Sequence, residues 1–172
     1  MCDLQAIAKQ KTNAELQRQL ADLSRAIDAM CREHAAKGLF HSGATLKRVV
    51  AICKEATEKQ RDAAINEYRW AVNQALLASQ SWVNALAAEA SASIDSLHEE
   101  SEKHIENICQ KLGKPELIAR LLSDLQLAEI AAKNDISLAL RVGFAERSRG
   151  LIRSIVGFVP KLLSKLQKGG VA

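Results

Sequence analysis

Histidines and carboxylates lie closest together in DSLHEESEKHIE, residues 95–106. Asp95 and His98 are three residues apart, and Glu100 and His104 four apart, so each pair would share one face of a helix. Such pairs can bind a metal ion. The di-iron sites of helical bundles, however, need Glu-x-x-His on two helices plus two further carboxylates, and the chain contains no Glu-x-x-His. The segment therefore indicates a charged helix surface, and we expect no metal and no cofactor.

Other catalytic patterns are equally weak. The stretch GLFHSG, residues 38–43, lacks the Lys-Ser/Thr pair and the preceding strand of a phosphate-binding loop. No serine stands in the strand-turn-helix motif that exposes a nucleophile. We therefore expect no catalytic residues and a non-enzymatic role.

The four cysteines, Cys2, Cys31, Cys53 and Cys109, show no CxxC or metal-ligand spacing. This distribution predicts free, reduced thiols and hence a cytoplasmic protein. The first residues contain no apolar run of the kind found in signal peptides. No uninterrupted apolar stretch reaches the roughly 20 residues that a bilayer requires, so we expect no membrane span.

The end of the chain, LIRSIVGFVPKLLSKLQKGG at residues 151–170, is the segment with the clearest functional signal. On a helical wheel its nine large apolar residues fall within an arc of about 160°. Cations, serines and glutamine fill the remaining arc. A cationic polar face opposite a large apolar face is typical of helices that lie on membrane surfaces. The predicted membrane- or partner-binding residues are Leu151, Ile152, Arg153, Ile155, Val156, Phe158, Val159, Lys161, Leu162, Leu163, Lys165, Leu166 and Lys168.

Basic charge is concentrated in the same region. Seven of the 24 basic residues but only one of the 20 acidic residues, Glu146, lie between 141 and 168. That region therefore carries +6 and the rest of the chain −2, while the whole chain carries +4. Cations suit helix C-termini, but that preference accounts for only part of the excess. A weakly acidic body with a basic end predicts a negatively charged partner.

Three targets fit this segment. We expect it to dock on an anionic membrane, which would make the protein peripheral to a membrane, or to enter a groove of a partner protein. Packing on the protein's own core is the simplest alternative. Nucleic acid is disfavoured, because the only aromatic residue here, Phe158, lies on the apolar face. Gly150 is expected to separate the segment from the preceding helix, and Pro160 to kink it or to start a new helix.

Composition and the positions of glycine and proline predict the rest of the fold. Hydrophobic residues make up 48% of the chain and aromatic residues 3%, with 8 Gly and 2 Pro in all, which favours long helices over strands. Gly38 and Gly113 are expected to end helices, Ser42 to cap the second, and Pro115 to begin the last. The first helix, roughly residues 3–37, has an a/d seam, which consists of Leu16, Leu20, Leu23, Ile27 and Met30. The middle segment has a seam at helical spacing from Leu46 to Leu112, which includes Ile94, and the last helix has one from Leu117 to Leu140.

Residues 44–112 contain no Gly or Pro, and the sequence leaves open whether they form one helix or two. A break fits either residues 78–82 or a capping box formed by Ser96 and Glu99. A break near residue 80 would give a four-helix bundle. Either way we predict an all-α, elongated antiparallel bundle of three to four long helices.

The chain is thus divided into a bundle, residues 1–149, and a basic amphipathic helix with a short flexible end, residues 150–172. A second apolar stripe on the middle segment includes Trp70 and Leu77. Because a two-helix hairpin would leave these side chains in water, we expect this stripe to be buried within the bundle or between subunits. We therefore treat it as a possible assembly face of a homo-oligomer.

Overall fold

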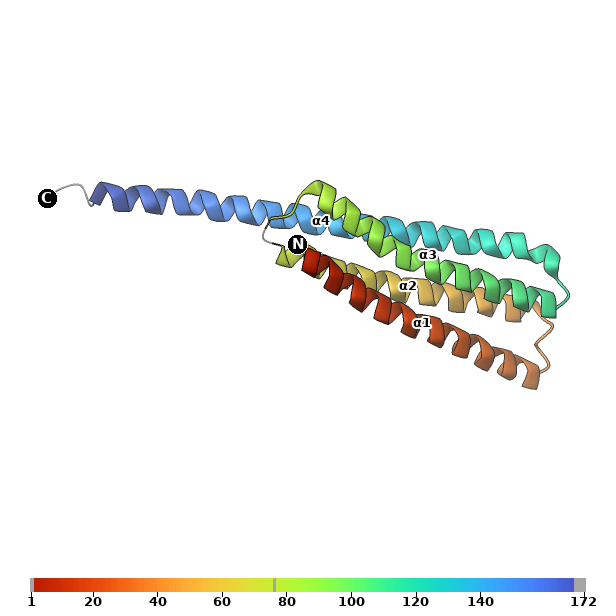
Figure 1. Cartoon of the computed structure of the whole chain (residues 1–172). Coiled ribbons are helices and arrows are strands. Elements are labelled where there is room, and N and C mark those ends of the chain that lie inside the picture. The colour runs from red at the N-terminus through yellow and green to blue at the C-terminus, as the bar shows by residue number, and fades with distance from the viewer. Residues whose placement is uncertain (1, 76, 169–172) are drawn as a thin grey trace.

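A computed structural model describes residues 2–75 and 77–168, and it describes side-chain surroundings for residues 3–75 and 77–149. The described residues form four α-helices and no strand. The helices are α1 (Cys2–Ala36), α2 (Gly43–Gln74), α3 (Gln80–Lys111) and α4 (Ile118–Lys168), and a short 3-10 turn, Pro115–Leu117, precedes α4. Figure 1 shows them side by side in an elongated bundle with alternating chain direction. The predicted all-α antiparallel bundle is confirmed.

The bundle has two inner and two outer helices. Helices α2 and α3 contact each other, and each also contacts both α1 and α4. Within the described part of the chain α1 and α4 do not contact one another. Figure 1 shows α1 and α4 on opposite sides of the α2–α3 pair. An outer helix therefore has neighbours on one side only.

The connections follow local backbone chemistry. Gly38 and Gly113 end α1 and α3 with φ near 65°, a conformation that costs glycine little because it has no Cβ. Residues 44–112 form two helices, because α2 ends at Gln74 and Ser79 caps α3 by accepting a hydrogen bond from Trp82 N at 3.2 Å. The capping box at Ser96 is not used. Ser96 lies inside α3 and donates to the Ala92 carbonyl instead, a bond that serine makes in mid-helix.

Apolar side chains form two core clusters separated by a polar layer. One cluster includes Leu16, Ala56 and Leu97, and the other includes Ala8, Ala64 and Ile94. The predicted seams of α1, α2 and α3 supply most of both clusters. Between the clusters, one helical turn from each, lie the buried side chains Thr12 and Gln60. Gln60 Nε2 donates to the Thr12 carbonyl at 3.4 Å, while Gln60 Oε1 and Thr12 Oγ1 have no partner in the described structure.

Two isoleucines test this view of the core. Ile94 is fully buried, whereas Ile7 is 40% exposed. We expect Ile94→Ala to lower the free energy of unfolding by about 2–5 kcal/mol, because it leaves a cavity. The matched change Ile7→Ala should cost clearly less, since water already reaches that side chain. Urea denaturation followed by circular dichroism measures both values, and equal losses would contradict the assigned core.

Candidate binding surface on helix α4

Helix α4 carries the predicted binding segment and has no break where one was expected. Its 51 residues, Ile118–Lys168, are helical through Gly150 and Pro160. The predictions of a separating Gly150 and of a new helix starting at Pro160 are therefore wrong. A glycine inside a helix costs only about 1 kcal/mol, and a proline removes one backbone hydrogen bond without preventing helix on both sides. The division of the chain at residue 150 is thus a division of composition, and as a domain boundary it stays a prediction.

The C-terminal segment, residues 151–168, extends beyond the other helices. In Figure 1 the bluest part of α4 continues past the end of the bundle formed by α1, α2 and α3. The thirteen predicted binding residues from Leu151 to Lys168 have helical backbone, but their side chains lie outside the described residues. No described helix is both long enough and apolar enough to cross a bilayer.

The part of α4 that lies against the bundle has an apolar face on each side. Its inner face contributes Leu125, Ile136 and Leu140, which are fully buried. A second set of apolar side chains points away from the core and is here called the outer stripe. It consists of Leu127, Ile130, Leu138 and Val142, with exposed fractions of 65%, 48%, 63% and 43%. The inner face follows the seam predicted for the last helix, but the outer stripe was not predicted. Its spacing of three, eight and four residues is the helical signal that would have revealed it.

Three acidic residues follow one edge of the outer stripe. Asp124, Asp135 and Glu146 are eleven residues apart, about three helical turns, so they lie in line along α4. Asp135 Oδ2 accepts from Arg61 Nη1 at 3.2 Å, and Glu146 Oε2 accepts from Arg69 Nη2 at 3.0 Å. These ion pairs join α4 to α2. Both carboxylates remain more than half exposed and can therefore meet a further cation.

The predicted assembly face of Trp70 and Leu77 is not one continuous stripe in the structure. Leu77 lies in the connection between α2 and α3 and is 82% exposed, so it is not buried within the bundle. The reason is that α2 ends at Gln74, three residues before it. Trp70 is half-buried against the core, and Lys11 Nζ lies 5.0 Å from its ring centroid. Burial of these two residues between subunits stays a prediction.

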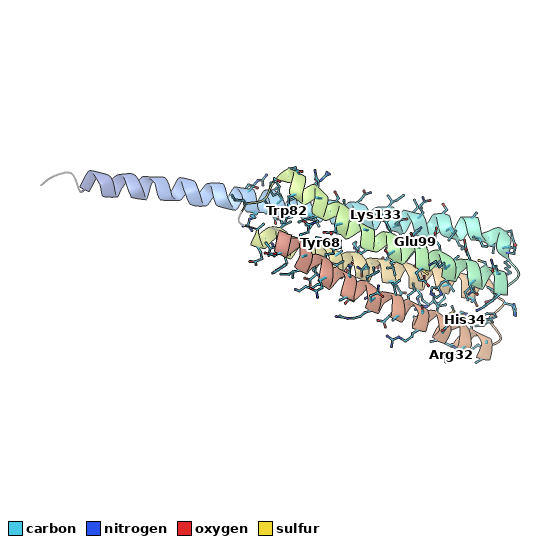
Figure 2. All side chains as sticks on the ribbon, viewed as in Figure 1. Arg32, His34, Tyr68, Trp82, Glu99 and Lys133 are labelled. Carbon is cyan, nitrogen blue, oxygen red and sulfur yellow. The ribbon has the colours of Figure 1, made fainter. Side chains whose placement is uncertain are left out.

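The histidine-rich segment forms a network of neutralised charges. His98 Nε2 lies 3.2 Å from Glu102 Oε1 and 3.2 Å from Glu129 Oε2. Lys133, on α4 (Figure 2), pairs with both Asp95 and Glu129. Burial lowers the pKa of the Lys133 ammonium, but its hydrogen bonds to these two carboxylates outweigh that effect and raise the pKa. No group of three metal ligands occurs among the described residues. The network matches the predicted charged helix surface and joins α3 to α4.

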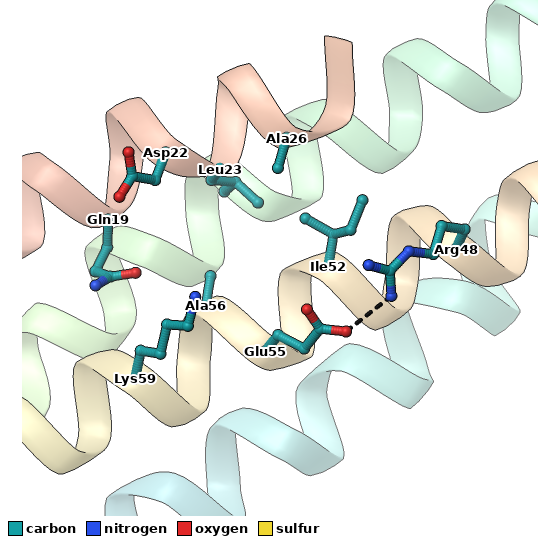
Figure 3. A pocket seen from close by; sticks show the side chains of 9 residues that line it. All are labelled: Gln19, Asp22, Leu23, Ala26, Arg48, Ile52, Glu55, Ala56 and Lys59. Atoms are coloured by element: carbon teal, nitrogen blue, oxygen red, sulfur yellow. Dashed lines mark hydrogen bonds and ion pairs between the residues drawn. The ribbon is translucent and has the colours of Figure 1, made fainter. Parts of the chain in front are cut away.

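A pocket of about 100 Å³ lies between α1 and α2. Figure 3 shows Leu23 and Ile52 among its apolar lining, with charged side chains around them. Arg48 Nη1 donates to Glu55 Oε1 at 2.8 Å, so this cation is already paired. The lining contains no histidine, cysteine, serine or threonine. The outer stripe and the C-terminal segment are the better candidates for a functional surface.

No family model, curated protein or solved structure matches this chain. The proposed function therefore rests on the residues and structure of this chain alone.

The described cysteines are free thiols in different environments. Cys53 and Cys109 are buried and Cys31 is half-buried. Burial raises the pKa of the Cys53 thiol from 9.0 to about 11, because the thiolate would lose its hydration. At pH 8 about one Cys53 in a thousand would then be the reactive thiolate.

We predict that a Cys2→Ser variant labels in the order Cys31 first, then Cys109 and Cys53. The measurement is reaction with an excess of a thiol reagent at pH 8, followed by mass spectrometry of peptides. All three thiols should react at once in denaturant, which serves as the control. Rapid labelling of Cys53 in the folded protein, or an intramolecular disulfide in unreduced protein, would contradict this assignment.

Proposed function

We propose that this protein is a non-enzymatic helical bundle whose C-terminal segment docks on an anionic membrane surface. The observation that carries the proposal is the continuation of α4 past the bundle to Lys168. In Figure 1 the ribbons of α1, α2 and α3 do not accompany this part of α4. Short amphipathic helices in water gain most of their stability from covering that face. The segment therefore needs an external cover.

The charge of the segment favours an anionic surface as that cover. Arg153, Lys161, Lys165 and Lys168 have no acidic residue among them between 151 and 168. Each contributes about 1 kcal/mol near an anionic leaflet, and the contribution falls off within a Debye length. The nine apolar residues add a contribution that salt does not screen. Binding should therefore be strong only when the vesicles contain anionic lipid, and it should be lost when the apolar arc is disrupted.

The decisive experiment compares two double variants that change the net charge equally. Ile155→Asp with Leu162→Asp places two carboxylates in the apolar arc, while Ser154→Asp with Ser164→Asp places two on the polar face. We expect the first variant to lose binding to vesicles of mixed phosphatidylserine and phosphatidylcholine. The second should only weaken it, because the apolar arc is intact. Co-sedimentation at low and high salt measures the bound fraction, with neutral vesicles and a chain ending at Arg149 as controls.

Three outcomes would overturn the proposal. Equal binding of both variants would show that the apolar arc does not enter the membrane. Equal binding of wild-type protein to neutral and anionic vesicles would remove the role of the cations. Loss of helical content throughout residues 1–149 in the Ile155/Leu162 variant would show that the segment belongs to the protein's own core.

A further inference from the structure

The outer stripe of α4 is a second apolar surface without a neighbour. It holds four of the seven large apolar side chains that are exposed in the described structure, although α4 is one helix of four. Leu127 and Leu138 are each more than 60% exposed, two residues from the fully buried Leu125 and Ile136. Scattered exposed leucines are ordinary, but a row of them along one helix face marks a contact surface.

The outer stripe continues in line into the C-terminal segment. An α-helix repeats every 18 residues after five turns and every 36 residues after ten turns. On the continuous helix α4, Val156 therefore follows Leu138 along the same line, and Leu163 follows Leu127. The apolar arc predicted for residues 151–168 includes both positions. One helix thus carries one long apolar line, of which only the first half lies on the bundle.

One edge of this line carries acidic residues on the bundle part and one cation beyond it. The acidic residues Asp124, Asp135 and Glu146 mark the edge on the bundle part. Arg153 stands 18 residues after Asp135 and so falls on the same edge. In an antiparallel pair of identical helices, an edge of one helix lies beside the same edge of the other. Turning α4 end for end therefore brings Arg153 of one copy beside Asp135 of the other.

We propose that the outer stripe binds the C-terminal segment of a second copy of this chain, in an antiparallel dimer whose two-fold axis passes close to Ala145. Leu138 then lies opposite Ile152 of the other copy, and Leu127 lies opposite Leu163. Asp135 comes beside Arg153 of the other copy. Because the segment extends beyond its own bundle (Figure 1), the two bundles lie almost end to end and do not collide. The same contact occurs twice, as a closed two-fold dimer requires.

The dimer goes beyond membrane docking and does not depend on it. It uses the same apolar arc, however, so each C-terminal segment can cover either the outer stripe of another copy or a membrane. Dimer and membrane-bound protein then exclude one another. Weakening the dimer alone should release the segment for vesicles.

The first test is the mass of the protein in lipid-free buffer. Sedimentation velocity should give about twice the 18.8 kDa of one chain for the wild type and 18.8 kDa for Leu127→Asp with Leu138→Asp. Both replaced side chains are exposed, so the helical content should stay unchanged by circular dichroism. The control is Leu39→Asp, at an exposed leucine in the connection between α1 and α2, away from the outer stripe. A monomeric wild type at 100 µM, or a dimer unaffected by the double change, would overturn the proposal.

The second test measures the direction and register of the two α4 helices in the dimer. It uses one added cysteine at a time in a chain with Cys2→Ser and Cys31→Ser. Ala145→Cys lies beside the two-fold axis and should form a disulfide with itself upon mild oxidation. Leu138→Cys should not link to itself but should link to Ile152→Cys when the two proteins are mixed. Self-linking of Leu138→Cys would indicate a parallel pair and would refute this arrangement.

Vesicle binding separates this inference from the proposed function. The Leu127/Leu138 variant should bind anionic vesicles at a lower lipid concentration than the wild type, since its segment is free. Vesicle binding without any dimer would refute the dimer and leave membrane docking standing. A dimer that never binds vesicles would refute membrane docking and leave the dimer standing.

Discussion

The structure depends on one constraint: apolar residues on two faces of a helix need a neighbour on each side. Helices α2 and α3 meet it by lying in the middle, where each contacts all three of the other helices. Their buried residues include Tyr68 and Ile94, which belong to the same core cluster. Helix α4 meets the constraint on its inner side only. The outer stripe and the C-terminal segment are therefore the parts for which we propose contact with another molecule.

The polar layer between the two core clusters has a different role. Thr12 and Gln60 cost stability there, because two of their buried oxygens lack hydrogen-bond partners. A core built mainly from alanine and aliphatic side chains offers similar packing when one helix slides by a turn, about 5.4 Å. Such a slide would place the buried amide of Gln60 against the apolar side chain of Ala8 or Leu16 in place of the polar Thr12. We interpret the layer as a device that fixes how α1 and α2 align, comparable to a single polar residue in a coiled-coil seam.

Electrostatics also divide the molecule into two parts. In the bundle, several carboxylates of α3 and α4 have nearby cations or an imidazole, as in the contacts of Glu129 with His98 and Lys133. These contacts join α3 to α4. In residues 151–168 the cations have no acid in their own sequence to pair with. Both proposed covers, a membrane and the acidic edge of another copy, supply negative charge at the place where the chain lacks it.

The amino-acid sequence by itself determined the helices, their seams and most of their ends. Leu16, Ile27 and Ile94 are buried as their spacing predicts, and Gly38 and Gly113 end helices as predicted, because these features depend on local geometry and helical period. Only the structure decided whether residues 44–112 were one helix, because the sequence allowed no break, a break at residues 78–82, or one at the capping box of Ser96 and Glu99. The exposure of Leu77 and Leu138 could not be predicted from the sequence either. A leucine is equally apolar whether it is buried or exposed. Its burial depends on which helix lies opposite, and this is decided by the assembled bundle and not by the neighbouring sequence.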